Sequence, residues 1–176
     1  SVPRPVAVFD LDGTLADTAP DLIGTLNHIL VAEGLAPLAF EDARDMIGAG
    51  ARALIQRGFA AADLELAPDR LDRHFREFLV HYGANLCRET RLFPHVADAL
   101  DALEAEGFAL AVCTNKVEEH SVALLDALGL GHRFAAICGR DTFPFFKPDP
   151  RHLTLTIERA GGVVEGSIMV GDSITD

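Results

Sequence analysis

The sequence predicts an α/β protein with a doubly wound, Rossmann-like parallel sheet and an inserted all-helical domain. After Pro94, short continuous apolar runs alternate with segments of helical spacing, and one isolated apolar run lies near the N-terminus. Strands that alternate with helices form parallel sheets covered on both faces, and right-handed crossovers make such sheets doubly wound. Between residues 20 and 86 no strand pattern interrupts the helical spacing, which indicates an insertion.

The first strand is expected over residues 6–9, directly after Pro5. This apolar run ends abruptly in the polar, glycine-containing segment Asp10-Leu11-Asp12-Gly13-Thr14. A buried strand that ends in a tight turn is typical of this pattern.

The insertion is expected to contain four helices. The first opens at Pro20 and ends before Gly34, and the fourth begins at Pro68, in keeping with proline at helix starts and glycine just past helix ends. The other two are expected near residues 40–47 and after Gly50. The predicted insertion spans residues 19–87, and the predicted core comprises residues 1–18 and 88–176.

Strands and helices alternate in the rest of the chain, and glycines follow the predicted helices. Strands are expected over residues 108–113, 134–138 and 168–170, and helices over residues 96–106, 118–128 and 153–160.

The composition excludes several classes of partner. The chain has 176 residues and a formal net charge of -12, which disfavours nucleic acid because phosphate-backbone binding needs clustered Lys and Arg. No apolar run approaches the roughly 20 residues of a bilayer span, so no membrane partner is expected. The three cysteines lack C-x-x-C spacing and predict reduced thiols in a cytoplasmic protein.

Polar side chains follow the predicted strands, and ligands of open parallel sheets bind beyond the carboxyl ends of the strands. Clustered carboxylates need a cation to stay ionised, and oxygen ligands favour Mg²⁺. Mg²⁺, a lysine and a hydroxyl together form a phosphate-binding set. The residues concerned are Asp10 and Asp12, then Thr114, Asn115 and Lys116, then Lys147, and finally Gly171, Asp172, Ser173 and Asp176.

The spacing of Asp10 and Asp12 suggests a division of labour. One carboxylate can attack phosphorus while the other transfers the proton. Lys116 stands next to Thr114 and Asn115 but is expected to be a surface or rim residue.

These segments resemble the four motifs of the haloacid dehalogenase superfamily of phosphohydrolases. The motifs occur in the family's order and span nearly the whole chain. They are Asp10-Leu11-Asp12-Gly13-Thr14, then Thr114 after an apolar strand, then Lys147-Pro148, and then Gly171-Asp172-Ser173-Ile174-Thr175-Asp176.

The resemblance implies that Asp10 attacks phosphorus and forms an aspartyl-phosphate. Asp12 would protonate the leaving alkoxide and then deprotonate the hydrolytic water. Mg²⁺ would be held by the Asp10 carboxylate, the Asp12 backbone carbonyl and Asp172.

The resemblance implies that the remaining motif residues bind the phosphate or position the residues that do so. Thr114, the Asn115 backbone N–H and Lys147 would bind the phosphate. Asp176 would orient Lys147 or a metal-bound water, and Ser173 would support this loop.

The insertion resembles the helical cap of the phosphoglycolate phosphatase branch. Its segment 47–54 resembles that branch's glycine-bearing loop before a helix. Gly48 and Gly50 let backbone approach a ligand, the helix N-terminus favours an anion, and Arg52 adds charge. These three residues would bind the substrate, for which 2-phosphoglycolate is the leading choice. A plain turn without substrate contact is the alternative.

The family continues beyond its fourth motif with further helix and strand. Because the chain ends at Asp176, it is expected to be truncated and to lack the C-terminal part of the core. The expected partner is a small phosphorylated metabolite, and a monomer or homodimer is expected.

Two alternatives to this function stay open. One is a sugar-phosphate phosphatase or mutase of the same superfamily, whose core residues would look the same. The other is a non-enzymatic, receiver-like phosphoacceptor module for signalling. A Schiff-base phosphonatase is disfavoured because the insertion contains no lysine.

Overall fold

The computed structural model describes residues 2–176 and contains two compact units. The first consists of the chain up to Asp17 together with Arg91–Asp176, and the second is Thr18–Thr90. Thr18 and residues 88–90, which the sequence analysis assigns to the core, belong to the helical unit. A long-range contact ties residues 88–90 to this unit: the buried Asp21 carboxylate accepts hydrogen bonds from the backbone N–H groups of Glu89 and Thr90.

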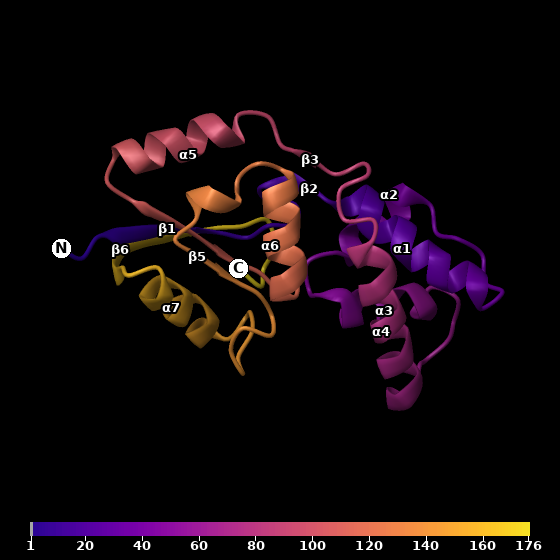
Figure 1. Ribbon diagram of the computed structural model, residues 1–176. Coiled ribbons are helices and arrows are strands. Elements are labelled where there is room, and N and C mark those ends of the chain that lie inside the picture. Colours follow the sequence, from indigo (N-terminus) through magenta and orange to yellow (C-terminus); the bar gives the residue numbers. More distant parts are fainter. Residues whose placement is uncertain (1) are drawn as a thin grey trace. The chain divides into compact units, whose positions relative to one another are not determined.

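The first unit contains a four-stranded parallel sheet (Figure 1). Its strand order is β5-β4-β1-β6, so β4 and β1 are the interior strands. The connection from β5 to β6 leads from one edge of the sheet to the other. This order confirms the predicted doubly wound sheet. The strands are β1 (Pro5–Phe9), β4 (Ala109–Cys113), β5 (Ala136–Cys138) and β6 (Val163–Val170).

Helices cover both faces of this sheet, and Figure 1 shows α5 and α7 on opposite sides of it. All five residues of β4 are buried, because a central strand with helices on both faces must be apolar on both. Asp149 caps the N-terminus of α7, because its side chain accepts a hydrogen bond from the Arg151 N–H. Pro150 is the first residue of the helix. The helices are α5 (Val96–Ala105), α6 (Glu118–Ala127), the short 3₁₀ turn η2 (Gly131–Arg133) and α7 (Pro150–Arg159).

Strand β6 is longer than the sequence predicts and lies at one edge of the described sheet. Its pairing with β1 is interrupted by a register shift between Pro5 and Ala7. Gly166 has a φ of +77°, and the Ser167 hydroxyl accepts the Val6 N–H at 2.8 Å. This irregularity explains why the apolar pattern indicates only the last part of the strand.

A two-stranded antiparallel ribbon joins β2 (Ala16–Asp17) to β3 (Arg91–Leu92). The sequence analysis missed it, because each strand has two residues and the pairing is long-range. The ribbon holds together the two points where the chain leaves and re-enters the first unit.

The second unit is helical, and no strand occurs in its described residues. Leu26, Ile55 and Phe59 are among the side chains that form its apolar core. Its elements are α1 (Ala19–Ala32), α2 (Phe40–Ala43), the 3₁₀ turn η1 (Arg44–Met46), α3 (Ala51–Ala60) and α4 (Pro68–Gly83). Along residues 2–176, no helix is both long and apolar enough to cross a membrane.

Candidate active site

The strand order places two aspartates at neighbouring strand ends. Asp10 follows β1, and Asp172 follows β6, which is the strand beside β1 on the far side from β4. In doubly wound sheets, the crevice at such a reversal of strand order is the usual ligand site. Thr114 follows β4, which is the other neighbour of β1. Asp10, Thr114 and Asp172 therefore follow three adjacent strands.

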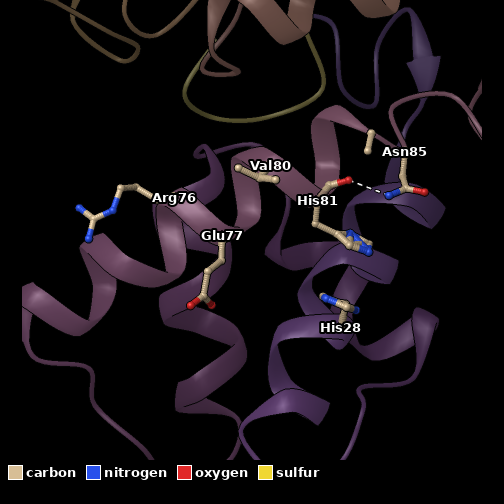
Figure 2. A pocket seen from close by; sticks show the side chains of 7 residues that line it. His28, Arg76, Glu77, Val80, His81 and Asn85 are labelled. Carbon is tan, nitrogen blue, oxygen red and sulfur yellow. Dashed lines mark hydrogen bonds between the residues drawn. The ribbon is translucent and has the colours of Figure 1, made fainter.

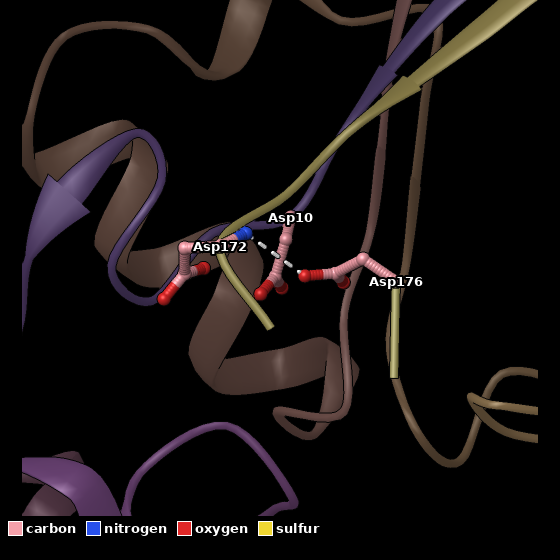
Figure 3. A group of neighbouring side chains, drawn as sticks. All are labelled: Asp10, Asp172 and Asp176. Atoms are coloured by element: carbon pink, nitrogen blue, oxygen red, sulfur yellow. Dashed lines mark hydrogen bonds between the residues drawn. The ribbon is translucent and has the colours of Figure 1, made fainter. Parts of the chain in front are cut away.

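Three carboxylates converge at this edge, as Figure 3 shows. Oxygen atoms of Asp10, Asp172 and Asp176 all lie within 4.8 Å of one another. Asp10 directly follows β1, whereas Asp172 and Asp176 come from the loop after β6 (Figure 3). A set of hard oxygen donors at this spacing suits a divalent cation such as Mg²⁺.

The Asp10 carboxyl is buried and electrostatically perturbed. Burial raises its pKa from 3.8 to about 7; Lys147 opposes this rise, whereas Asp12 and Asp176 add to it. The Asp10 side chain also accepts a 2.8 Å hydrogen bond from the Leu11 N–H. Burial disfavours the charged form of this acid, and a bound cation would stabilise the carboxylate, so Asp10 fits a metal site.

The Lys147 ammonium lies between two of these acids. Its Nζ is 3.1 Å from Asp10 Oδ1 and 2.6 Å from Asp176 Oδ1. Burial by itself lowers the pKa of Lys147, but Asp10 and Asp176 more than offset this and hold the pKa above 10.5. The lysine therefore stays charged beside Asp10.

The backbone of Lys147 is held from both sides. Asn115 Nδ2 donates to the Lys147 carbonyl at 3.1 Å, and His152 Nδ1 accepts the Lys147 N–H at 3.1 Å. Burial, followed by the charge of Lys147, lowers the pKa of His152, so the neutral ring can accept this bond. The sequence analysis did not find His152, because its partner is a backbone group in a loop.

Thr114 is positioned to donate from its side chain. Its backbone N–H bonds to the Cys138 carbonyl at 3.0 Å, which fixes the end of β4 against β5. Its Oγ1 accepts the Lys116 N–H at 3.1 Å. With that acceptor site taken, the Thr114 hydroxyl hydrogen can be directed toward an incoming oxygen.

Lys116 corrects an expectation of the sequence analysis. It is 7% exposed and is not a rim residue. Its Nζ lies 2.9 Å from Asp12 Oδ1, and both side chains are largely buried. A buried ammonium requires a nearby anion, and Asp12 supplies one. The expectation was wrong because local sequence does not show which acid from a neighbouring strand end will reach the lysine.

The Asp172 loop is held by short polar contacts. Thr14 Oγ1 donates to Asp172 Oδ1 at 2.7 Å. Gly13 has a φ of +82°, and a side chain there would collide with the Asp172 carboxylate. Asp176 Oδ2 accepts the N–H groups of Asp172 and Ser173, each at 3.0 Å. Asp176 therefore links this loop to Lys147, and the Ser173 N–H is one of the groups that donate to the Asp176 carboxylate.

The predicted substrate residues of the insertion lie in the second unit. Gly48 and Gly50 have φ values of +118° and +91°, and Gly50 directly precedes α3. The Arg52 guanidinium pairs with Asp72 at 2.6 Å and lies 4.2 Å from the centre of the Phe75 ring. These contacts occupy Arg52 within its own unit, and a role of the three residues in substrate binding stays a prediction.

A pocket of about 580 Å³ also lies within the helical unit (Figure 2). The rings of His28 and His81 stack in it with their centres 4.0 Å apart. Burial, followed by the charges of His28 and Arg88, lowers the pKa of His81. The pocket is lined by His28, Arg76, Glu77, Val80, His81, Ala84 and Asn85, none of which the sequence analysis places in the site.

Comparison with known proteins agrees with this geometry. The sequence profile of the family described as haloacid dehalogenase-like hydrolase matches residues 7–176. A phosphoglycolate phosphatase of Agrobacterium fabrum is 52% identical over 172 residues, covering 98% of this chain and 74% of that protein. A phosphoglycolate phosphatase of Mesorhizobium japonicum is 50% identical over 173 residues, covering 98% of this chain and 76% of that protein.

Solved structures show the same likeness. The crystal structure of a predicted phosphoglycolate phosphatase from Haemophilus somnus superimposes with a TM-score of 0.87 at 36% identity, covering 98% of this chain and 79% of that one. The strand order, the aspartates at the strand ends and the profile match lead to one conclusion. The chain belongs to the haloacid dehalogenase-like hydrolase family and is a phosphoric monoester hydrolase.

Proposed function

We propose that this phosphatase hydrolyses a small anionic monoester, 2-phosphoglycolate, through an aspartyl-phosphate on Asp10, with Mg²⁺ as cofactor. The observation that carries the proposal is the buried contact of 3.1 Å between the Asp10 carboxylate and the Lys147 ammonium. A cation beside a nucleophilic acid lets that acid approach a phosphate dianion. The names of the relatives that are 52% and 50% identical support the choice of substrate.

In the first step, an Asp10 oxygen attacks phosphorus, and the bond from phosphorus to the leaving oxygen breaks. Asp12, which takes up a proton before this step, gives it to that oxygen, so that glycolate leaves as the alcohol. Lys147 balances the charge of Asp10 and of the phosphoryl oxygens, and the Thr114 hydroxyl donates to one of them.

In the second step, Asp12 takes a proton from water, and the water oxygen attacks phosphorus. The bond from Asp10 to phosphorus breaks, inorganic phosphate leaves, and the Asp10 carboxylate is restored. Lys147 and Thr114 keep the phosphoryl group in place through both steps, because the same oxygens carry the charge in each.

Asp10 and Asp172, together with the Asp12 backbone carbonyl, would hold Mg²⁺. Asp176 belongs to the same carboxylate cluster, although its oxygens already bond to Lys147 and to the Asp172 loop. When bound, the metal supplies positive charge that neutralises the clustered carboxylates and the phosphate.

The helical unit, Thr18–Thr90, would act as the inserted cap domain. The turn around Gly48 and Gly50, followed by α3, would contribute to substrate selection. Glycine at these two positions of positive φ lets the backbone approach the substrate closely.

A panel of phosphate monoesters tests this function directly. The panel comprises 2-phosphoglycolate, hexose phosphates, nucleotides and an aryl phosphate, each assayed for kcat/KM with Mg²⁺ and with a chelator. The expected result is Mg²⁺-dependent turnover that is fastest with 2-phosphoglycolate. A higher kcat/KM for hexose phosphates would favour the sugar-phosphate alternative, and absence of turnover with a stable phosphoprotein would favour a phosphoacceptor module.

A further inference from the structure

Lys116 is a buried cation that the proposed chemical steps do not use. Its side chain is 4% exposed, and its Nζ lies 2.9 Å from Asp12 Oδ1. Moving an ammonium out of water carries a large desolvation free energy, so a buried lysine indicates a structural or functional use of its charge. Lys147 already supplies the cation beside the nucleophile Asp10, so charge balance at the phosphate gives Lys116 no separate role.

The two lysines are divided between the two acids. Lys147 contacts Asp10, the residue that attacks phosphorus, whereas Lys116 contacts Asp12, the residue that protonates the leaving oxygen. Lys116 therefore lies on the leaving-group side of the reaction. A cation there would interact with whatever charge the leaving group carries.

The leaving group of 2-phosphoglycolate carries a carboxylate separated from the ester oxygen by one CH₂. When Asp12 reaches that ester oxygen, the substrate carboxylate must lie close to the Asp12 carboxyl. Two such groups repel each other unless a cation lies between them. The ammonium of Lys116 has three donors and can serve both oxygens.

Hydrogen bonds hold the backbone of Lys116, so the position from which its side chain extends is defined. The Lys116 N–H donates to Thr114 Oγ1 at 3.1 Å, and its carbonyl accepts the Arg140 N–H at 2.9 Å. A side chain at Gly139 would collide with the backbone at Lys116 and Glu118, so this loop packs tightly against the end of β5. A preorganised group of this kind contributes to specificity.

We propose that Lys116 is the residue that recognises the carboxylate of the substrate's leaving group and so selects 2-phospho-carboxylates over uncharged esters. The inference rests on the proposed function of Asp12 as the acid at the leaving oxygen. It assigns carboxylate recognition to the first unit, in place of Arg52, whose guanidinium is paired with Asp72.

Ethyl phosphate provides the matched substrate, since it replaces the carboxylate of 2-phosphoglycolate with a methyl group. The readout is the ratio of kcat/KM for 2-phosphoglycolate to kcat/KM for ethyl phosphate. In Lys116→Met this ratio should fall roughly 10- to 100-fold, the range expected for a charged hydrogen bond. A general loss of activity or of folded protein would lower both values and leave the ratio unchanged.

Three further variants complete the experiment. Lys116→Arg keeps the charge and should retain most of the ratio. Arg133→Met removes an ion-paired arginine of the same unit that bonds Asp101 and Glu104, and it should leave the ratio at the wild-type value. Arg52→Met tests the competing residue and should also preserve the ratio.

The outcomes separate this inference from the function on which it rests. A ratio in Lys116→Met within about twofold of wild type overturns the inference while wild-type preference for 2-phosphoglycolate stands. Loss of the ratio in Arg52→Met alone also overturns it and assigns the carboxylate to Arg52. A wild-type enzyme that does not prefer 2-phosphoglycolate over ethyl phosphate overturns both the inference and the proposed substrate.

Discussion

The hydroxyl of Thr14 donates a 2.7 Å hydrogen bond to the carboxylate of Asp172, 158 residues along the chain. Thr14 follows β1 and Asp172 follows β6, so this bond joins the two loops that bring the carboxylates together. The absence of a side chain at Gly13 lets the Asp172 carboxylate approach the first loop. Thr14 thus orients Asp172, one of the metal ligands proposed here.

Replacing Thr14 with valine should weaken Mg²⁺ binding. Valine keeps the shape of threonine but cannot donate to Asp172, and loss of such an orienting bond typically lowers metal affinity by about 10- to 100-fold. The Mg²⁺ concentration that gives half-maximal activity should rise accordingly, with kcat at saturating Mg²⁺ changed far less. Thr14→Ser is the matched control and should behave like wild type. An unchanged Mg²⁺ requirement in Thr14→Val would show that the bond does not orient Asp172.

Asp10 and Asp12 should give different phenotypes although only Leu11 separates them. Asp10→Asn should abolish formation of the phosphoenzyme, because the attacking oxygen is lost. Asp12→Asn should still bind Mg²⁺ and should lose about 10²- to 10⁴-fold in rate, the usual contribution of general acid–base catalysis.

An aryl phosphate sharpens this comparison. Its good leaving group needs little proton donation, so Asp12→Asn should form the aspartyl-phosphate and then hydrolyse it slowly. Mass spectrometry should detect the added phosphoryl group on Asp10. A label on Asp12 or Asp172, or turnover by Asp10→Asn near the wild-type rate, would contradict the mechanism.

Mg²⁺ should stabilise the protein more at about pH 8 than at about pH 6. Burial raises the pKa of Asp10 from 3.8 to about 7 in the metal-free protein. The stability contributed by this raised pKa is present below 3.8 and is lost as the pH rises through about 7. Mg²⁺ binds the carboxylate, so below about pH 7 it must displace a proton, and its affinity should fall about tenfold per pH unit.

The measurement is the increase in Tm caused by Mg²⁺ across this pH range. The increase should grow as the pH rises to about 7 and then level off. Asp10→Asn removes the titrating group, so its smaller Mg²⁺ effect should vary little with pH. An equal increase at both pH values in the wild-type protein would contradict the proposed ligation by Asp10.

Asp21→Asn should destabilise the protein without changing the chemistry of the first unit. The buried Asp21 carboxylate accepts the N–H groups of Glu89 and Thr90 and the Thr90 hydroxyl, at 2.8 to 3.2 Å. Asparagine replaces one carboxylate oxygen of Asp21 with an NH₂ group, which is a donor and cannot accept from these N–H and O–H groups. The free energy of unfolding should fall by about 1–3 kcal/mol, measured by denaturant titration.

Asp69→Asn serves as the control for this variant. Asp69 lies in the first turn of α4 and is exposed, so its replacement should change the free energy of unfolding by less than about 0.5 kcal/mol. Equal stability of Asp21→Asn and wild type would show that the closure of residues 88–90 onto α1 contributes little.

Much of the fold followed from local patterns. The apolar runs 6–9 and 108–113 predicted β1 and β4 nearly to the residue, because strands buried on both faces must be continuously apolar. Helix ends followed from proline and glycine, as at Pro68, the first residue of α4. Since parallel strands carry ligands at their carboxyl ends, the same patterns also predicted where Asp10, Thr114 and Asp172 would gather.

Tertiary structure alone decided which of these polar groups meet. Lys116 and Asp12 pair, and so do Thr14 and Asp172, across loops that are neighbours only because the strands are ordered β5-β4-β1-β6. The same holds for the β2–β3 ribbon, whose partners lie more than seventy residues apart. The sequence by itself determined which polar residues follow the strands and at which edge of the sheet they lie. Their pairing depends on long-range packing and burial, which have no periodic signature along the chain.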